Sequence, residues 1–547
     1  MPQKTNNRFM PLVMALCVVI GIVIGTFYAN HFSGNRLSII NSTGNKLNNL
    51  LHIIEDQYVD TVQVNDLVEK AVPQILSELD PHSVYISAKD VQMATDELKG
   101  SFSGVGIEFV IRDDTLHVQN VISNGPAERA GVLAGDLVVT VDDKPFTGKT
   151  LTNEEAMHRL KGPKDTKVKL GLLRYGDKKI HHVTVTRGDI PTRSVTATYM
   201  LDSKTGYIRL KSFGENTYPE LLIALAKLSG QGFTNLCIDL RGNTGGYLQS
   251  AVQIANEFLP KNRLIVYTEG RKSPRQDYRS DGRGSYQRIP LVILIDEGSA
   301  SASEILAGAI QDNDRGTIIG RRSFGKGLVQ QPIEFGDHSM LRLTIARYYS
   351  PSGRCIQKPY SSGDKKNYED DLVSRYEHGE FFSEDSIKHA GKEYHTSIGR
   401  PVFGGGGITP DYFIAEDTTS VTSYYKQAAM SGLMLNFAYT YTDQNRQKLS
   451  AYGTMRELSA YLARQNTVEQ FAQFAEKNGL RRRNLMIQRS HKLLERFINS
   501  RIIYNMQSED AWIEFLNDDD PVILKARELF DSNATFPEAP QEADKKH

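Results

Sequence analysis

The spacing of apolar positions changes several times along the chain, and each change predicts a different kind of segment. Apolar residues recur every three or four positions from about residue 37 to 78, which predicts helices. Short apolar runs broken by Gly and Pro then continue to about residue 185 and predict strands joined by turns. Buried strands alternate with helical spacing from about 190 to 415, and helical spacing returns from 416 to 534. The pattern predicts a multidomain α/β protein.

The N-terminal run from Phe9 to Phe27 carries no charge and reaches the roughly 20 residues that a helix needs to cross a bilayer. Lys4 and Arg8 precede it, and no lysine or arginine follows before Arg36. This asymmetry predicts a cytoplasmic stub and a single-pass anchor in the inner (cytoplasmic) membrane, with the rest of the chain in the periplasm or an equivalent extracytoplasmic space. A cleaved signal peptide is the alternative, although the run is longer than a usual signal core and no A-x-A-like site follows it.

Composition excludes several functional classes. The 547 residues include 65 Lys and Arg and 65 Asp and Glu, so the overall charge does not suit a protein that grips nucleic acid. Cys17, Cys237 and Cys355 show neither the spacing of a disulfide framework nor that of a metal site. We therefore expect no nucleic-acid partner, no metal and no organic cofactor.

The candidate chemistry lies in a run of small residues, Gly298–Glu304, which follows an apolar strand and opens a helical pattern. Small side chains let a substrate backbone approach closely, and the start of a helix presents free N–H groups to a developing oxyanion. Lys326 lies in a Gly-flanked turn twenty-five positions after Ser301. Because a buried lysine with a lowered pKa can serve as the base for a serine, the pair predicts a serine hydrolase without a catalytic histidine.

Three other interpretations use the same residues. Ser323-x-x-Lys326 matches the motif of penicillin-binding enzymes, but the Lys-Thr-Gly that those enzymes place later stands earlier here, at 204–206. A phosphate-binding loop would need Ser or Thr where this chain has Gly327. The serines of the run would also suit a helix N-cap without catalysis. The spacing of the lysine and the surrounding motifs favour the catalytic interpretation.

Residues 99–188 predict a small β-rich domain with a candidate peptide site. Gly104, Val105, Gly106 and Ile107 lead into an edge strand, and a Gly-Pro-Ala-Glu-Arg-Ala-Gly segment and a Gly-Asp strand follow. This order resembles a PDZ domain. The resemblance implies that N–H groups of the loop hold a C-terminal carboxylate while the strand edge pairs with the rest of the peptide. The alternative is an ordinary β domain whose glycines only make turns.

The complete set of motifs resembles the carboxyl-terminal processing proteases, the tail-specific proteases of peptidase family S41, from roughly Leu47 to Asp411. The resemblance implies a serine endopeptidase with a Ser-Lys catalytic pair, an embedded PDZ domain and an α/β core similar to those of ClpP and crotonase. The motifs that carry it, besides the PDZ segments, are Leu79–Ser83, Asp239–Gly246, Gly298–Glu304, Phe324–Gly327, Arg347–Arg354 and Gly404–Asp411.

The resemblance assigns roles to individual side chains. Ser301, the middle serine of its run, corresponds to the nucleophile, Lys326 to the general base, and Gln330 to the residue that orients the lysine. An amide at that place would fix the base as the third member of a triad does. We interpret His82 and Arg241, which lie in two of the matching motifs, as structural residues of their turns.

Backbone groups complete the implied site. The oxyanion would be held by the N–H of Ala302 and by that of a glycine in the pair Gly245-Gly246. Asp312 lies eleven positions after Ser301 and matches an acidic position that is implied to support the site.

These interpretations define the expected function. The protein is expected to cut exported proteins near their free C-termini, with the PDZ domain capturing the terminus or gating the active site; a homo-oligomer or an adaptor protein are further candidate partners. The alternative is a catalytically silent binding or scaffold protein of the same fold. The expected parts are 1–32 (stub and membrane anchor), 33–98 (helical), 99–188 (PDZ), 189–415 (protease core), 416–534 (C-terminal helical region) and 535–547 (disordered tail).

Overall fold

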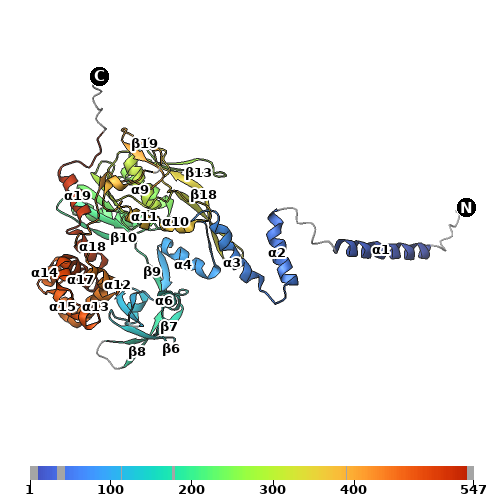
Figure 1. The fold of residues 1–547 in the computed structure, drawn as a ribbon, viewed down its shortest axis with the longest axis horizontal. Helices are drawn as coiled ribbons and strands as arrows, with labels where there is room; N and C mark the ends of the chain where they lie inside the picture. The colour runs from blue at the N-terminus through green and yellow to red at the C-terminus, as the bar shows by residue number, and fades with distance from the viewer. Residues whose placement is uncertain are drawn as a thin grey trace, which may run out of the picture. The chain divides into compact units, whose positions relative to one another are not determined.

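The computed structural model falls into two compact units, Met1–Ile75 and Leu76–His547 (Figure 1). The residues before the predicted anchor together with its first residue (1–9), the first part of the predicted N-terminal helical region (34–42) and the last part of the predicted tail (539–547) lie outside the described residues. The structure describes residues 10–33, 43–112, 114–122, 124–174, 179–389 and 391–538.

The N-terminal unit is helical. It contains α1 (Met10–Ser33), α2 (Thr43–Gln57) and α3 (Val64–Ser77), of which α3 runs past the boundary of the unit. The helical spacing expected from residue 37 onward is interrupted at 58–63, between α2 and α3. In the described part of the chain, no helix combines the length and hydropathy that crossing a membrane requires, so the expected anchor is not confirmed.

The PDZ domain is connected to the core through a pair of antiparallel strands, β2 (Ser101–Gly104) and β9 (Gly188–Pro191). Its sheet has the order β3-β4-β5-β7-β8, with β6 beside β5, and packs with two helices around an apolar core. Because β3 ends this order, one of its edges can accept a further strand. The elements are β3 (Ile107–Arg112), β4 (Thr115–Val121), α5 (Pro126–Arg129), β5 (Leu137–Val141), β6 (Lys144–Pro145), α6 (Asn153–Leu160), β7 (Lys167–Leu173) and β8 (Ile180–Thr186).

The predicted protease core is built on a six-stranded sheet of order β10-β11-β12-β15-β16-β21, parallel except for the pair β10–β11. Its strands are β10 (Val195–Met200), β11 (Thr205–Leu210), β12 (Asn235–Asp239), β15 (Leu291–Ile295), β16 (Thr317–Gly320) and β21 (Tyr412–Phe413). The helices that cover it are α7 (Thr217–Ser229), α8 (Leu248–Phe258), α9 (Ala302–Asp312), α18 (Glu509–Asn517) and α19 (Pro521–Asp531).

The central strands are apolar at almost every position because helices cover both faces of the sheet. Ile238 and Ile293 pack on the side of α7, α8 and α9. Their neighbours Cys237 and Val292 point to the opposite face and pack with α18 and α19. The β12–β15 region therefore lies in the middle of a three-layer core, and the active-site turns follow its strand ends.

A second sheet lies beside the first and carries the segment that follows Lys326. Its strands have the order β1-β18-β13-β14, and β17 also pairs with β18. β1 places the Leu79–Ser83 motif beside β18, since Val84 pairs with Arg342. The strands are β1 (Val84–Ile86), β13 (Leu264–Glu269), β14 (Gln276–Arg279), β17 (Leu328–Glu334) and β18 (Met340–Tyr349).

The segment between β18 and β21 adds short elements to the core. They are α10 (Lys365–Glu369), α11 (Asp371–Glu377), the 3-10 helix η2 (Glu384–Ser386), β19 (Glu393–His395) and β20 (Pro401–Phe403). Tyr368 of α10 reaches the active-site region, as described below.

The predicted C-terminal helical region divides into two parts. Six helices form an apolar core of their own: α12 (Ser423–Met430), α13 (Leu433–Leu449), α14 (Met455–Leu462), α15 (Thr467–Lys477), α16 (Asn484–Arg489) and α17 (His491–Met506). The remaining two, α18 and α19, pack on the central sheet. The expected tail does not begin at Thr535, because this residue is buried and its carbonyl accepts the Thr317 hydroxyl at 2.9 Å.

Candidate active site

The small-residue run forms the turn that leads into α9. Ser301 lies at the N-cap with φ 54° and ψ −113°, a sparsely populated backbone region for a residue other than glycine. Ser299 and Ser303 are fully buried, and their hydroxyls donate to the carbonyls of Leu240 (2.8 Å) and Asn243 (2.9 Å). Within the described part of the chain the half-buried Ser301 hydroxyl donates no such bond. Of the three serines, Ser301 has its hydroxyl left for chemistry.

Lys326 lies half-buried in the loop between β16 and β17. Burial lowers the pKa of Lys326, as does the nearby Arg342 guanidinium, while the carboxylates of Glu304 and Asp80 act in the opposite direction. Among the described residues, none forms a hydrogen bond or an ion pair with the Lys326 ammonium. These surroundings favour the neutral amine that a general base requires.

Glu304 is a buried carboxylate that joins the two candidate catalytic segments. Its Oε2 accepts the N–H of Ser301 at 2.8 Å and that of Lys326 at 2.9 Å. Its Oε1 accepts the Ser323 hydroxyl at 2.5 Å and the Gly325 N–H at 2.7 Å. Burial raises the pKa of Glu304 to about 7, although all four donors favour the anion. In its ionised form, the carboxylate ties the turn at Ser301 to the loop that carries Lys326.

Tyr348 makes a second link between the same two segments, this time through carbonyl groups. Its hydroxyl lies 3.1 Å from the Ser301 carbonyl oxygen and also contacts the carbonyl oxygen of Lys326. Burial raises the pKa of Tyr348 well above its usual value, so the phenol stays protonated and can donate. In the described structure no hydrogen bond joins Ser301 Oγ to Lys326 Nζ. Glu304 and Tyr348, rather than a direct bond, set the relative position of the two residues.

Gln330 lies on β17 and is tied to the neighbouring strand. Its Nε2 donates to Thr344 Oγ1 at 3.4 Å, and the two residues are paired in the register of β17 and β18. The described hydrogen bonds do not include one between the Gln330 side chain and Lys326. The Gln330 amide is thus bonded to β18, and its role in orienting Lys326 stays a prediction.

The predicted oxyanion donors meet beside Ser301. Gly245 has φ +99°, and a Cβ built on it would lie 2.7 Å from the Ser301 Cβ and 2.8 Å from the Ala302 nitrogen, so a side chain does not fit there. The Gly245 N–H donates to Asn243 Oδ1 at 2.8 Å, whereas the Gly246 N–H has no partner among the described residues. Gly246, with the N–H of Ala302 at the start of α9, is therefore the better candidate donor.

Asp312 lies at the far end of α9 from Ser301, about 16 Å away along the helix axis at 1.5 Å per residue. Its carboxylate accepts the Arg354 guanidinium at 2.7 Å and the Ser352 N–H at 3.1 Å, and the Asp312 and Arg354 side chains are almost completely buried. The structure does not bring Asp312 to the candidate catalytic pair. Asp312 instead binds the segment that follows β18, the strand that carries Tyr348.

The predicted carboxylate-binding loop of the PDZ domain has its carbonyls fixed inside the domain. The Val105 carbonyl accepts the Ala127 N–H at 2.8 Å, and the Gly106 carbonyl accepts the Ile122 N–H at 3.0 Å. Because the C=O and the following N–H of a trans peptide point in opposite directions, the N–H groups of Gly106 and Ile107 face the other way. Gly104 precedes this loop at the end of β2.

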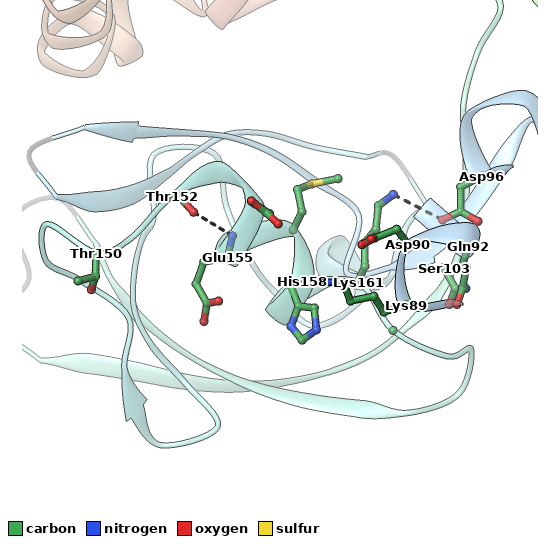
Figure 2. Close-up of a pocket in the computed structure, with 13 residues that line it drawn as sticks. Lys89, Asp90, Gln92, Asp96, Ser103, Thr150, Thr152, Glu155, His158 and Lys161 are labelled. Atoms are coloured by element: carbon green, nitrogen blue, oxygen red, sulfur yellow. Dashed lines mark hydrogen bonds and ion pairs between the residues drawn. The ribbon is translucent and has the colours of Figure 1, made fainter. Parts of the chain in front are cut away.

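A cavity of about 750 Å³ lies next to this loop, between α6 and α4 (Ala88–Lys99) (Figure 2). Ser103, immediately before Gly104, lines it with a buried hydroxyl that has no partner among the described residues. Lys161 points towards Asp96, with 3.5 Å between Nζ and Oδ2 (Figure 2). Polar side chains thus line part of the cavity, which begins at the residue before the predicted binding loop for a peptide C-terminus.

The Leu79–Ser83 motif contributes more to the site than its sequence indicated. His82, which we interpreted as a turn residue, lies near Lys326, and its Nε2 is 2.8 Å from the Tyr368 hydroxyl. Burial, followed by the charge of Lys326, lowers the pKa of His82 to about 4, so the ring is neutral at pH 7. No role was predicted for Glu304 or Tyr348 from the sequence, although both lie within the motifs Gly298–Glu304 and Arg347–Arg354.

Comparison with known proteins adds independent information on the family. Residues 204–366 match the model of peptidase family S41, residues 103–186 match the PDZ domain, and residues 424–508 match a family of unknown function, DUF8443. A carboxy-terminal-processing protease of Bartonella bacilliformis is 39% identical over 310 residues, which cover 56% of this chain and 70% of that protein.

Two further relatives carry similar names. A carboxyl-terminal-processing protease of Synechocystis sp. is 37% identical over 295 residues, covering 53% of this chain and 68% of that protein. The solved structure of a photosystem II D1 C-terminal processing protease is 30% identical, with a TM-score of 0.34, and the match covers 58% of this chain and 85% of that one. The curated relatives show that this chain belongs to the carboxy-terminal-processing proteases of peptidase family S41 and is a serine-type peptidase.

Proposed function

We propose that the protein cleaves peptide bonds with Ser301 as the nucleophile and Lys326 as the general base. The observation that supports this most is that Glu304 accepts the backbone N–H groups of both residues, while the Tyr348 hydroxyl contacts the carbonyl oxygens of both. A half-buried serine at a helix start is thereby held near a lysine whose pKa is lowered. Such preorganisation is what nucleophilic catalysis requires of a serine and its base.

In this mechanism the neutral amine of Lys326 takes the hydroxyl proton of Ser301 while Oγ attacks the scissile carbonyl carbon. The oxyanion accepts hydrogen bonds from the N–H groups of Ala302 and Gly246, each contributing about 3 kcal/mol in the transition state. The lysine ammonium then gives its proton to the leaving amine, which leaves an acyl group on Ser301. A water molecule attacks the acyl group with Lys326 again acting as the base.

The PDZ domain is proposed to bind the free C-terminus of a protein substrate. The N–H groups of Gly106 and Ile107 would hold the carboxylate, β3 would pair with the peptide, and the adjoining cavity would receive neighbouring substrate residues. This assignment gives the protease a preference for cutting exported proteins near their C-termini.

A pair of substrates tests this proposal. An unfolded polypeptide with a free C-terminus should be cleaved with a kcat/KM about ten-fold higher than the same polypeptide with an amidated C-terminus, because losing one charge-assisted hydrogen bond costs about 1.5–3 kcal/mol. The products are measured by mass spectrometry. The Gly106→Ala variant should remove the difference, since its Cβ would lie 2.9 Å from Ile190 Cδ1 at a φ of +81°. Equal cleavage of both substrates by the unaltered protein would contradict C-terminal capture.

We also propose that the Phe9–Phe27 segment attaches the protein to the inner membrane with the catalytic part outside the cytoplasm. Large apolar side chains of α1, among them Val18 and Ile22, are exposed. The protein should remain with membranes during alkaline carbonate extraction. The variant Val18→Arg/Ile22→Arg should be released, because each arginine costs about 2.5–3.5 kcal/mol at the bilayer centre. Release of the unaltered full chain would contradict this attachment.

A further inference from the structure

A chain of hydrogen bonds runs from the Leu79–Ser83 motif to Gln330. Gln330 Nε2 donates to Thr344 Oγ1 at 3.4 Å, and Thr344 Oγ1 donates to Asp80 Oδ1 at 3.0 Å. Asp80 is only 8% exposed. It also accepts the N–H groups of His82 and Ser83, at 2.9 and 3.0 Å, and the Ser83 hydroxyl at 2.5 Å. A buried carboxylate therefore ends a chain that begins at the predicted partner of the catalytic lysine.

Three neighbouring strands hold this chain in place. Gln330 of β17 and Thr344 of β18 are directly paired, and β1 pairs with the same strand β18. The Thr344 N–H donates to Ser83 Oγ at 3.1 Å, just before β1 begins. The order across the sheet is thus Gln330, Thr344 and the Asp80–Ser83 turn, with Lys326 two residues before β17.

The chemistry of the groups fixes the direction of each bond. Asp80 accepts four hydrogen bonds, so it acts as an acceptor toward Thr344, and the single proton of the Thr344 hydroxyl is used on it. The Thr344 oxygen then offers only lone pairs to Gln330, which must turn its NH2 group towards it. A reversed amide would place two oxygens with lone pairs against each other. The Gln330 carbonyl, Oε1, is consequently directed away from Thr344.

We propose that Asp80 and Thr344 are positioning residues that set the orientation of the Gln330 amide, so that its carbonyl accepts an N–H of Lys326. This inference rests on the proposed role of Lys326 as the base. A neutral lysine amine has two protons and one lone pair, and holding one proton on a carbonyl directs the lone pair to the Ser301 hydroxyl. Asp80 acts through two intermediate side chains and does not touch the reacting atoms.

A double-mutant cycle on the full chain tests the proposal. Thr344→Val and Gln330→Ala should each lower kcat about ten-fold and leave KM unchanged, because substrate binding does not involve them. The double variant should be no slower than the slower single variant, since both changes break one chain. Asp80→Ala should resemble Thr344→Val, because the Thr344 hydroxyl then loses its acceptor and can donate to a reversed Gln330 amide. Thr344→Ser keeps the hydroxyl and should stay within about two-fold of the unaltered protein.

Thr196→Val is the matched control. It makes the same change at a buried strand position whose hydroxyl has no partner among the described residues, so kcat should not change. An unchanged kcat in Thr344→Val, or a double variant whose losses multiply to about a hundred-fold, would overturn the proposal. If Thr344→Val does not fold, as judged by thermal unfolding, the comparison of Asp80→Ala with Thr344→Ser decides instead; equal rates in those two variants count against the proposal.

The failure of this inference can be told apart from the failure of the proposed function. Ser301→Ala and Lys326→Met are assayed in parallel with the same substrate. If those two variants still cleave the substrate, the Ser-Lys mechanism is wrong, and so is this inference. If those two variants are inactive but the losses in kcat of Thr344→Val and Gln330→Ala multiply in the double variant, only the proposed positioning role is wrong.

Discussion

Lys326→Met is expected to lower kcat for peptide cleavage by at least about 10⁴-fold, and Ser301→Ala by about 10⁶-fold. Methionine fills a similar volume but has no lone pair that could take the serine proton, and alanine removes the nucleophile itself. Because both side chains act in one step, the double variant should be no slower than Ser301→Ala. The measurement is steady-state cleavage of an unfolded protein, followed by the appearance of new N-termini.

The matched control is Lys365→Met, an exposed lysine paired with Glu369 in α10. It carries the same substitution in the same unit and should leave kcat within about two-fold. Thermal unfolding of each variant separates lost chemistry from lost structure. A Lys326→Met protein that is folded and cleaves at an undiminished rate would rule out the lysine as the base.

Glu304→Gln is expected to lower kcat by about 100-fold and to reduce the free energy of unfolding by about 3 kcal/mol, because the new NH2 group faces two donors and hydrogen bonds to a charged group contribute about 1.5–3 kcal/mol each. Each Glu304 carboxylate oxygen accepts two hydrogen bonds, so the NH2 group meets two donors whichever oxygen it replaces. The two donors to Oε2 are the N–H groups of Ser301 and Lys326. In the variant, the segments that carry Ser301 and Lys326 should therefore no longer be held at a fixed distance from each other. Chemical denaturation and steady-state kinetics measure the two effects.

The pH dependence of kcat and of the free energy of unfolding distinguishes the titration of Glu304 from that of Lys326. Since burial raises the pKa of Glu304 from 4.5 to about 7, the folded state binds a proton more tightly than the unfolded state. Its contribution to the free energy of unfolding is therefore present below pH 4.5 and is lost as pH rises through about 7. Activity should change in the opposite direction, because the ionised carboxylate accepts all four donors.

Expected results are a kcat that rises through about pH 7 in the unaltered protein and a free energy of unfolding that falls over the same range. In Glu304→Gln both changes at this pH should be absent, and the remaining rise in kcat should report the titration of Lys326. A variant that retains the rise in kcat near pH 7 and the fall in unfolding free energy would show that another group causes them.

The sequence indicated the two residues of the proposed catalytic pair, but it did not indicate which contacts position them. Ser301 and Lys326 could be found because a small-residue run, a helix start and a Gly-flanked lysine are local features in one order. Glu304 belongs to the small-residue run, but the sequence did not indicate that its carboxylate binds the Ser323–Lys326 loop. These bonds form only because the loop folds against the start of α9. A contact between two distant turns leaves no periodic signal in either of them.

Other contacts were beyond sequence reasoning for the same physical reason. Asp80 and Thr344 are 264 residues apart, and strand pairing brings them together. The helical spacing over 416–534 predicted helices, but it did not indicate that α18 and α19 would pack on the central sheet rather than with the other C-terminal helices. The choice between Gly245 and Gly246 as an oxyanion donor also required coordinates, because the Asn243 side chain uses one of the two N–H groups.

The central claim is that Ser301 carries the acyl group during cleavage with Lys326 as its base. The most direct test is to quench the protein with an activated ester substrate within the first turnover and to locate the added mass by peptide mapping. We predict an adduct on Ser301, absent in Ser301→Ala and formed at least about 10⁴-fold more slowly in Lys326→Met. An adduct on Ser299, Ser303 or Ser323 instead, or one that forms at an unchanged rate without Lys326, would contradict the account.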